Sequence, residues 1–316
     1  MLGLATRLDW PRVLAALAQA SSPLLVLAMS LTLVSLLIRT WRWRLLLGQQ
    51  APRAGPLLST YVVGVAAGLL VPASGELARA GLLAHRGGLR TSFLLGAAAL
   101  EKLLDGVVVV ALFVVGLSYT IGLSWGFAVL GRALVVLGIA VGALVLATRL
   151  APRRDAPVAA GPAPPWTAAA VRLTGVWAGF AQGAGAVARL PRTTQLAILG
   201  LTLLSWCCAC LVTVCTLAAF ALPTDWALAA VLYAALLLGL SVPSAPGAVG
   251  TFEVVVVAVL DAFGLPGPRA AAFALGFHAV TFAPLLLAGA LAWGLSRPSA
   301  PPPPPGPSTS APTDAR

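Results

Sequence analysis

The stretch Gly68-Leu-Leu-Val-Pro72 returns later in the chain, in nearly the same form, as Gly239-Leu-Ser-Val-Pro243. Both copies interrupt long apolar runs, and each is followed by small residues and a glutamate, Glu76 and Glu253. A glycine and proline break beside a carboxylate, repeated in the two halves of a strongly apolar chain, is typical of paired broken helices around a polar site in a membrane transporter. We therefore expect two broken helical hairpins around a transport-type site.

Composition indicates an integral membrane protein. Of the 316 residues, 59% are hydrophobic and only 9% are charged, and the mean hydropathy is +0.97. A helix needs about 20 apolar residues to cross a hydrocarbon core of roughly 30 Å. Five stretches meet this requirement, namely residues 22–38, 92–117, 126–148, 194–221 and 271–294. The predicted fold class is an all-α membrane protein built as a polytopic helical bundle.

Two further apolar segments, residues 57–86 and 227–263, are each split by the repeated motif. Each segment is compatible with a re-entrant hairpin or with a pair of short spans. Breaks are expected where proline removes a backbone donor and where glycine permits a tight turn. These positions are Pro72, Gly75, Pro243, Gly247 and Gly250.

The net charge of +11 is explained by membrane topology, because the basic residues gather between apolar segments. We therefore predict no nucleic-acid partner. Basic residues from Arg79 to Arg90 follow the first break almost at once, so the first hairpin is expected to open from the cytoplasm and the second from outside. Two re-entrant hairpins of opposite orientation form an inverted repeat, with residues 126–148 as the connecting span.

The expected organisation has five regions and a location in the plasma (inner) membrane, multi-pass, with a cytoplasmic C-terminus. The regions are an interfacial N-terminal segment (1–21), a first membrane half (22–148), a cytoplasmic linker with a surface helix (149–193), a second membrane half (194–297) and a disordered proline-rich tail (298–316).

Charged residues in the first half are candidates for lipid-headgroup binding, because a charge in hydrocarbon costs at least about 2.5 to 3.5 kcal/mol and usually faces a partner or a wet cavity. Glu76 and Arg79 lie three residues apart on one helix face, so they can pair, or Arg79 can hold an anion. Glu101 and Asp105 lie four apart and repel unless a cation intervenes. Lys102 points elsewhere, which makes Arg79 the nearer candidate. The alternative places all five in the interfacial region near the cytoplasm.

In the second half, the ionisable candidates are Glu253, which stands alone before a run of valines, and His278. Both are added to the predicted headgroup-binding set. A single buried histidine is also compatible with a hydrogen-bonded packing role.

Arg39, Trp41, Arg42, Trp43 and Arg44 follow the first predicted span, where it meets the cytoplasm. Aromatic and basic residues at that depth are typical interface anchors that contact lipid phosphates. We therefore expect all five to be anchors.

No motif in the sequence indicates a cofactor, a metal site or an ATP-driven pump. The chain has no Walker-type loop, no His-Glu-x-x-His and no Gly-x-Ser-x-Gly. Its cysteines, Cys207, Cys208, Cys210 and Cys215, fall in one predicted span and point in different directions on a helix. We interpret them as structural, with no cofactor or metal predicted.

Four motifs together resemble the lysylphosphatidylglycerol synthase transmembrane region, a flippase-like family. They are Arg39-Thr-Trp-Arg-Trp-Arg44, Val71-Pro-Ala-Ser-Gly-Glu-Leu-Ala-Arg-Ala80, Glu101-Lys-Leu-Leu-Asp105 and Val242-Pro-Ser-Ala-Pro-Gly-Ala-Val-Gly-Thr-Phe-Glu253. The resemblance implies a polytopic inner-membrane protein, and in the best understood relatives a flippase that moves an aminoacylated phospholipid between leaflets. Those relatives make the lipid in a soluble C-terminal domain, which is not expected here, so synthase activity is not carried over.

The leading hypothesis is a lipid translocase that moves an anionic or aminoacylated phospholipid, or a polyprenyl- or glycolipid. In it, Arg79 and Lys102 attract a phosphate while the carboxylates handle a cationic or hydroxylated headgroup. One alternative is an intramembrane lipid-modifying transferase with a carboxylate as general base. Another is a non-catalytic partner of cell-envelope enzymes.

Overall fold

A computed structural model describes residues 9–71, 74–87, 89–121, 190–240 and 245–295. In these residues every regular element is helical. The helices are α2 (Trp10–Ala18), α3 (Ser22–Leu47), η1 (Gly48–Gln50), α4 (Ala54–Leu70), α5 (Ser74–Gly87), α6 (Thr91–Ile121), α9 (Arg192–Ala219), α10 (Trp226–Gly239), η2 (Pro246–Ala248), α11 (Thr251–Ala262) and α12 (Pro268–Leu295). The all-α prediction is confirmed.

Among the described residues, three segments are long and apolar enough to cross a membrane: Ser22–Gln50, Arg192–Ala219 and Pro268–Leu295. By contrast α4 has 17 residues and α10 has 14. At 1.5 Å per residue they reach only about 25 and 21 Å, less than the roughly 30 Å of hydrocarbon. The chain is therefore a multi-pass membrane protein that combines long helices with shorter paired ones.

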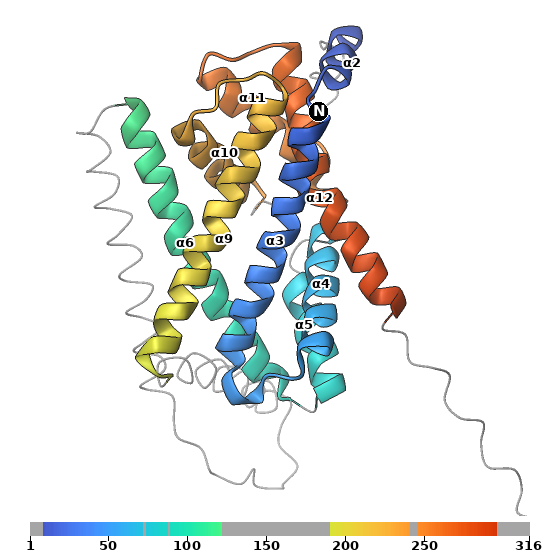
Figure 1. Cartoon of the computed structure of the whole chain (residues 1–316), viewed down its shortest axis with the longest axis vertical. Helices are drawn as coiled ribbons and strands as arrows, with labels where there is room; N and C mark the ends of the chain where they lie inside the picture. Colours follow the sequence, from blue (N-terminus) through green and yellow to red (C-terminus); the bar gives the residue numbers. More distant parts are fainter. Residues whose placement is uncertain (1–8, 72–73, 88, 122–189, 241–244, 296–316) are drawn as a thin grey trace, which may run out of the picture.

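The described helices form two halves with the same element order (Figure 1). In the first half, α3 is followed by the α4–α5 pair and then by α6; in the second, α9 is followed by the α10–α11 pair and then by α12. The α4–α5 pair lies in the lower part of the molecule and the α10–α11 pair in the upper part.

Most helix contacts have a counterpart between the equivalent helices of the two halves. The long helices α3 and α9 pack against each other, α4 packs on α12, and α10 packs correspondingly on α6. Each pair also contacts the long helix that follows it, α5 with α6 and α11 with α12. Such an exchange of contacts is expected for any structural repeat of two halves, and the opposite placement of the two hairpins in Figure 1 is what an inverted repeat adds.

Glycines let the arms of each hairpin approach closely. A Cβ atom at Gly64 of α4 would lie 2.7 Å from the Cβ of Arg79 on α5, and one at Gly75 would lie 2.8 Å from the carbonyl oxygen of Gly64. In the second hairpin, a Cβ at Gly239 would lie 2.6 Å from a methyl group of Val255. Backbone packing at this distance leaves no room for a side chain.

The second break is held in a compact turn. Gly247 and Gly250 have φ values of 71° and 81°, in the region that favours glycine, and α11 begins directly after Gly250. The short helix η2 inside this turn contacts α4 of the first hairpin. The two hairpins therefore meet between the halves. Pro72 and Pro243, predicted break residues, lie outside the described residues.

The predicted N-terminal segment contains α2, which Asp9 caps by accepting a hydrogen bond from the backbone N–H of Arg12 at 3.3 Å. Val13 of α2 is fully buried, and the helix packs on α12. The connecting span (126–148), the surface helix of the linker and the proline-rich tail lie outside the described residues.

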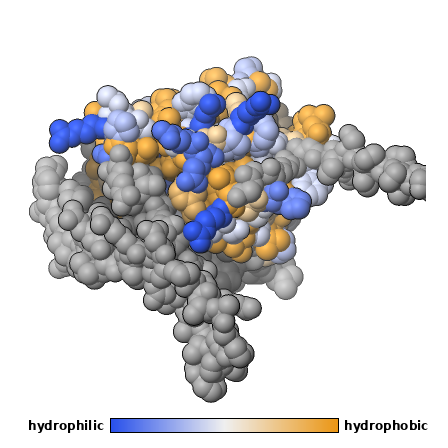
Figure 2. All heavy atoms as spheres, turned by 90° about the horizontal axis from the view of Figure 1, so that it is seen from below, coloured by the Kyte–Doolittle hydropathy of each residue, from blue (hydrophilic) through white to orange (hydrophobic). Residues whose placement is uncertain are grey.

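The lower end of the molecule carries a group of hydrophilic atoms among apolar ones (Figure 2). Several arginines lie at helix ends on this side. They are Arg44 in the last turn of α3, Arg53 before α4, Arg90 before α6 and Arg192 at the start of α9. At the upper end, the acidic residues Asp225 and Asp261 lie at the start of α10 and near the end of α11. The two ends therefore differ in charge.

Candidate functional site

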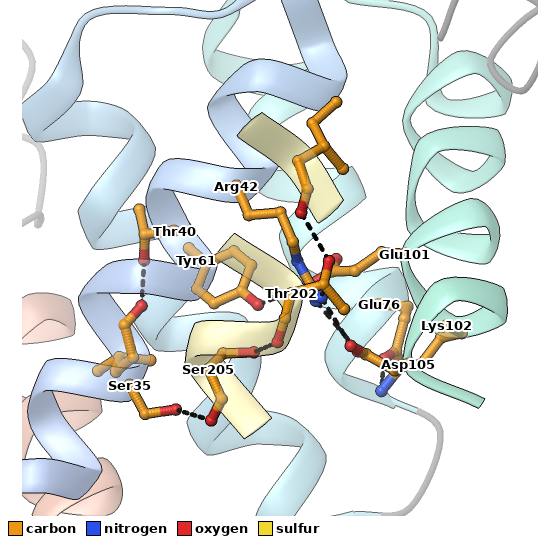
Figure 3. A network of polar contacts seen from close by, with 12 residues as sticks. Ser35, Thr40, Arg42, Tyr61, Glu76, Glu101, Lys102, Asp105, Thr202 and Ser205 are labelled. Atoms are coloured by element: carbon orange, nitrogen blue, oxygen red, sulfur yellow. Dashed lines mark hydrogen bonds and ion pairs between the residues drawn. The ribbon is translucent and has the colours of Figure 1, made fainter. Parts of the chain in front are cut away.

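The strongest polar feature is an ion cluster inside the first half (Figure 3). Arg42 of α3 is fully buried and binds two carboxylates of α6. Its Nη2 lies 2.8 Å from Oε1 of Glu101, and its Nη1 and Nη2 lie 2.6 and 3.0 Å from the two carboxylate oxygens of Asp105. Nη1 also donates to the hydroxyl of Thr202 on α9 at 3.1 Å. This planar fork is the geometry that arginine offers to carboxylates.

A second arginine completes the cluster. Nη1 of Arg79, on α5, lies 2.7 Å from Oε2 of Glu101. The Tyr61 hydroxyl of α4 donates to Oε1 of the same carboxylate at 2.8 Å. The Arg79 guanidinium also lies over the rings of Trp43 and Tyr61, 4.8 and 5.1 Å from their centroids. This combination of charge pairing and cation–π contact stabilises a cation in an apolar interior.

We call Arg42, Arg79, Glu101 and Asp105 the arginine–carboxylate cluster. The Trp206 indole N–H on α9 donates to Oδ1 of Asp105 at 3.2 Å. With Tyr61 and the tryptophan included, the cluster connects α3, α4, α5, α6 and α9. Its two positive and two negative charges cancel, so its geometry fits a role in positioning helices.

Two features of the sequence interpretation differ from the structure. The first span was expected to end at residue 38, but α3 continues to Leu47, so Arg42 and Trp43 lie in the protein interior and are not interface anchors. Trp41, in contrast, is 52% exposed, and the guanidinium of Arg44 lies 5.2 Å from its ring centroid. These two residues lie on the outer surface, and their anchoring role stays a prediction.

The partner assignments also change. The predicted cation between Glu101 and Asp105 was Arg79, but the residue that bridges them is Arg42, while Arg79 contacts Glu101. Glu76 does not pair with Arg79; its Oε1 lies 2.9 Å from Nζ of Lys102. The interhelical register sets these pairs, and spacing within one helix does not reveal it.

A corresponding contact occurs in the second half. Oε1 of Glu253 lies 2.6 Å from Nδ1 of His278, and the backbone N–H of Gly250 donates to its Oε2, also at 2.6 Å. Glu76 and Glu253 are each the third residue of the second arm of a hairpin, and each partner lies on the long helix that follows. The two halves thus carry equivalent acid–base contacts.

The two contacts differ in their surroundings. Lys102 is 63% exposed at its side chain, whereas Glu253 and His278 are 18% and 13% exposed. The His278 ring stacks on Phe252 at a centroid distance of 4.4 Å and meets Phe282 edge-on at 4.3 Å. The second contact is therefore held in an aromatic setting that fixes its geometry.

A cavity of about 70 Å³ lies between the halves. It is lined by helices of both halves, α3, α4, α9, α10 and α12. Its polar lining residues are Thr32, Ser35 and Arg39 from α3, Tyr233 from α10 and Thr281 from α12. Arg39 thus lines an internal cavity with polar and apolar walls, and this position differs from the membrane-anchor position predicted for it.

Sequence reasoning did not single out Tyr61, Thr202, Trp206 or the hydroxyls of the cavity. One signal was present on α9, where four hydroxyl residues lie within a long apolar run and are all buried: Thr202, Ser205, Thr213 and Thr216. Within the described part of the chain, no group of three His, Cys, Asp or Glu residues is placed to hold a metal ion, and the four cysteines are free.

A family model described as the lysylphosphatidylglycerol synthase TM region matches residues 1–289. The chain belongs to this family. Membership places it among membrane proteins related to lipid metabolism or transport. No curated protein matches the chain.

Proposed function

We propose that this member of the lysylphosphatidylglycerol synthase TM region family is a lipid translocase. Its substrate would be an anionic or aminoacylated phospholipid, or a polyprenyl- or glycolipid. The observation that carries the proposal is that two hairpins of short helices lie at opposite ends of the molecule, contact each other through α4 and η2, and flank a cavity that both halves line with polar and apolar side chains. In transporters with inverted repeats, substrate sites lie at such a junction.

The charge asymmetry supports an orientation. Arginines gather at the lower end, where α4 and α6 begin, and positively charged ends face the cytoplasm. We therefore place the lower end, with the open side of the first hairpin and the end of α12, in the cytoplasm. In this proposed orientation, both hairpins are re-entrant and the protein lies in the plasma membrane.

Transport accounts for the buried charges better than catalysis does. A general base must be free to accept a proton, but Glu101 and Asp105 are each bound by arginine. Such a cluster instead keeps α3, α5 and α6 in a fixed relation and joins them to α9 of the second half. In the proposed rocking mechanism, the first half moves against the second about the junction with α9, where the Arg42–Thr202 and Trp206–Asp105 hydrogen bonds lie, and this movement alternates access to the cavity.

The test is a leaflet-exchange assay with the whole protein in liposomes. Fluorescent phosphatidylglycerol, lysyl-phosphatidylglycerol, a polyprenyl phosphate and a glycolipid are each placed in both leaflets, and a membrane-impermeant reductant quenches only the outer one. A translocase makes the inner pool accessible. If none of these lipids exchanges faster than in empty liposomes, the proposal is wrong; chemical conversion of a labelled lipid in detergent would instead indicate a transferase.

A further inference from the structure

Arg39 differs from the other interior arginines of the first half. Arg42 and Arg79 each contact a carboxylate, whereas Arg39 forms no ion pair with any residue that the structure describes. Its guanidinium carbon lies 5.9 Å from the ring centroid of Trp206. Its Nε is buried and has no hydrogen-bond partner among the described residues, which is also true of the Nε atoms of Arg42 and Arg79, so the missing ion pair is what sets Arg39 apart. Asp105 attracts Arg39 at longer range, but the interior then holds three arginines (Arg39, Arg42 and Arg79) against the two carboxylates of the cluster. One positive charge is left over and is costly in an apolar setting, so this site favours an anion.

The surroundings of Arg39 are suited to phosphate. Thr32, Ser35 and Thr281 place hydroxyl groups around the same cavity. These hydroxyls now donate to backbone carbonyls, for example from Thr281 Oγ1 to the oxygen of Phe277 at 2.7 Å. Hydroxyl groups rotate to suit a ligand, and arginine matches the geometry of phosphate oxygens.

The size of the cavity limits what it can hold. One water molecule requires roughly 10 to 15 Å³ of such space. The cavity of about 70 Å³ therefore has room for a phosphate group but not for acyl chains. The chains of a bound lipid must extend between helices toward the bilayer while the phosphate stays inside.

We propose that the cavity between the halves binds the phosphate of a phospholipid through Arg39, with the hydroxyls of Thr32, Ser35 and Thr281 around it. This inference deepens the proposed translocase function and rests on it for the role of the site in transport. It moves the phosphate contact from Arg79 and Lys102, which have carboxylate partners, to an arginine that has none among the described residues.

Binding in detergent tests the site separately from transport. Calorimetric titration of the solubilised protein uses three probes: dihexanoyl phosphatidic acid, dihexanoylglycerol, which lacks the phosphate, and inorganic phosphate. The variants are Arg39→Gln, Arg39→Lys and, as a matched control on the same helix, Arg44→Gln. Arg44 contacts Trp41 and does not line the cavity.

We expect the wild type and Arg44→Gln to bind phosphatidic acid alike, Arg39→Gln to bind it at least about tenfold more weakly, and Arg39→Lys to retain part of the affinity because it keeps the charge. Dihexanoylglycerol should bind more weakly and without dependence on Arg39. The Arg39→Lys variant also shows that a loss in Arg39→Gln reflects charge and not misfolding.

Three results would overturn the inference: equal binding of phosphatidic acid by Arg39→Gln and wild type, equal affinity for dihexanoylglycerol, or inorganic phosphate binding as tightly as the lipid, which would indicate a free anion as ligand. These outcomes are distinguishable from failure of the proposed function. If the wild type exchanges lipids between leaflets but its binding does not depend on Arg39, the phosphate site is wrong and the translocase proposal stands. If binding depends on Arg39 but no lipid is exchanged, the translocase proposal is wrong and the phosphate site stands.

Discussion

At the residue scale, Arg42 is the central side chain of the arginine–carboxylate cluster. It is the only described residue that forms ion pairs with both carboxylates of α6. Removing one partner of a buried ion cluster leaves the others uncompensated in an apolar interior. The cost is about 3 to 5 kcal/mol, whereas the net contribution of the intact cluster is much smaller. The cluster is thus weak as a source of stability and strong as a constraint on which helices meet.

We predict that Arg42→Met lowers the free energy of unfolding by about 3 to 5 kcal/mol, because Glu101 and Asp105 lose their common cation. Thermal unfolding in detergent measures the effect. Arg44→Met serves as the control and should change stability by less than about 0.5 kcal/mol, since its partner is the exposed ring of Trp41.

A rescue variant identifies the cause. Combining Arg42→Met with Glu101→Gln and Asp105→Asn removes the stranded charges and should recover part of the lost stability. An Arg42→Met protein as stable as the wild type would show that the cluster is not a constraint on the fold.

The two acid–base contacts, Glu76–Lys102 and Glu253–His278, are expected to differ in their contribution to stability. We predict that Glu253→Gln destabilises the protein by about 1 to 3 kcal/mol, because this carboxylate accepts charge-assisted hydrogen bonds in a half-buried site. Glu76→Gln should cost at most about 1 kcal/mol, because Lys102 is largely exposed. Unfolding temperatures of the two variants, compared side by side, check the order. Equal effects would show that the aromatic setting of His278 contributes nothing.

At the element scale, the hairpins depend on backbone contact between their arms. We predict that Gly64→Ala destabilises the protein by about 1 to 3 kcal/mol, because its Cβ would lie 2.9 Å from the backbone oxygen of Gly75 and would displace Arg79. Gly81→Ala, on α5, is the matched control, since nothing lies within 4 Å of its Cβ. This substitution should stabilise the helix by about 0.5 to 1 kcal/mol. Opposite shifts in unfolding temperature are expected, and shifts of the same sign would contradict the close packing of α4 and α5.

The same scale shows what the sequence could predict. The breaks near Gly75 and Gly250 follow from local rules, because proline removes a backbone donor and glycine permits a tight turn. The rule is not general, since Pro284 lies inside α12 and Gly64 inside α4. The end of the first span was placed too early because arginines usually mark the membrane boundary. Arg42 escapes that rule through carboxylates supplied by α6, and no local pattern shows that α3 and α6 meet there.

Pairing between helices is the part that could not be predicted. The spacing of Glu76 and Arg79 permits a pair within α5, but the packing of α5 on α6 gives each a different partner. For Arg39, the sequence shows the charge but not the cavity, which exists only because five helices of both halves converge.

At the scale of the whole molecule, the proposed mechanism requires the halves to move against each other. Each hairpin contacts one long helix of the other half: α4 of the first hairpin packs on α12, and α10 of the second packs on α6. A covalent link across one of them should stop transport, whereas a link within one half should not. The structure offers a suitable pair for each case.

We predict that a disulfide between Gly116→Cys and Ala230→Cys blocks leaflet exchange and that a reductant restores it. A Cβ at Gly116 on α6 would lie 3.4 Å from the Cβ of Ala230 on α10, close to the spacing of a disulfide.

The control is Gly239→Cys with Val255→Cys, whose Cβ atoms would lie 3.6 Å apart within the second hairpin. Both pairs are introduced after Cys207, Cys208, Cys210 and Cys215 have been replaced by alanine. Because the control link joins two arms that already move together, oxidation should leave its transport unchanged. Full exchange in the oxidised α6–α10 protein would show that the halves do not move against each other at this interface, and the rocking mechanism would then be wrong.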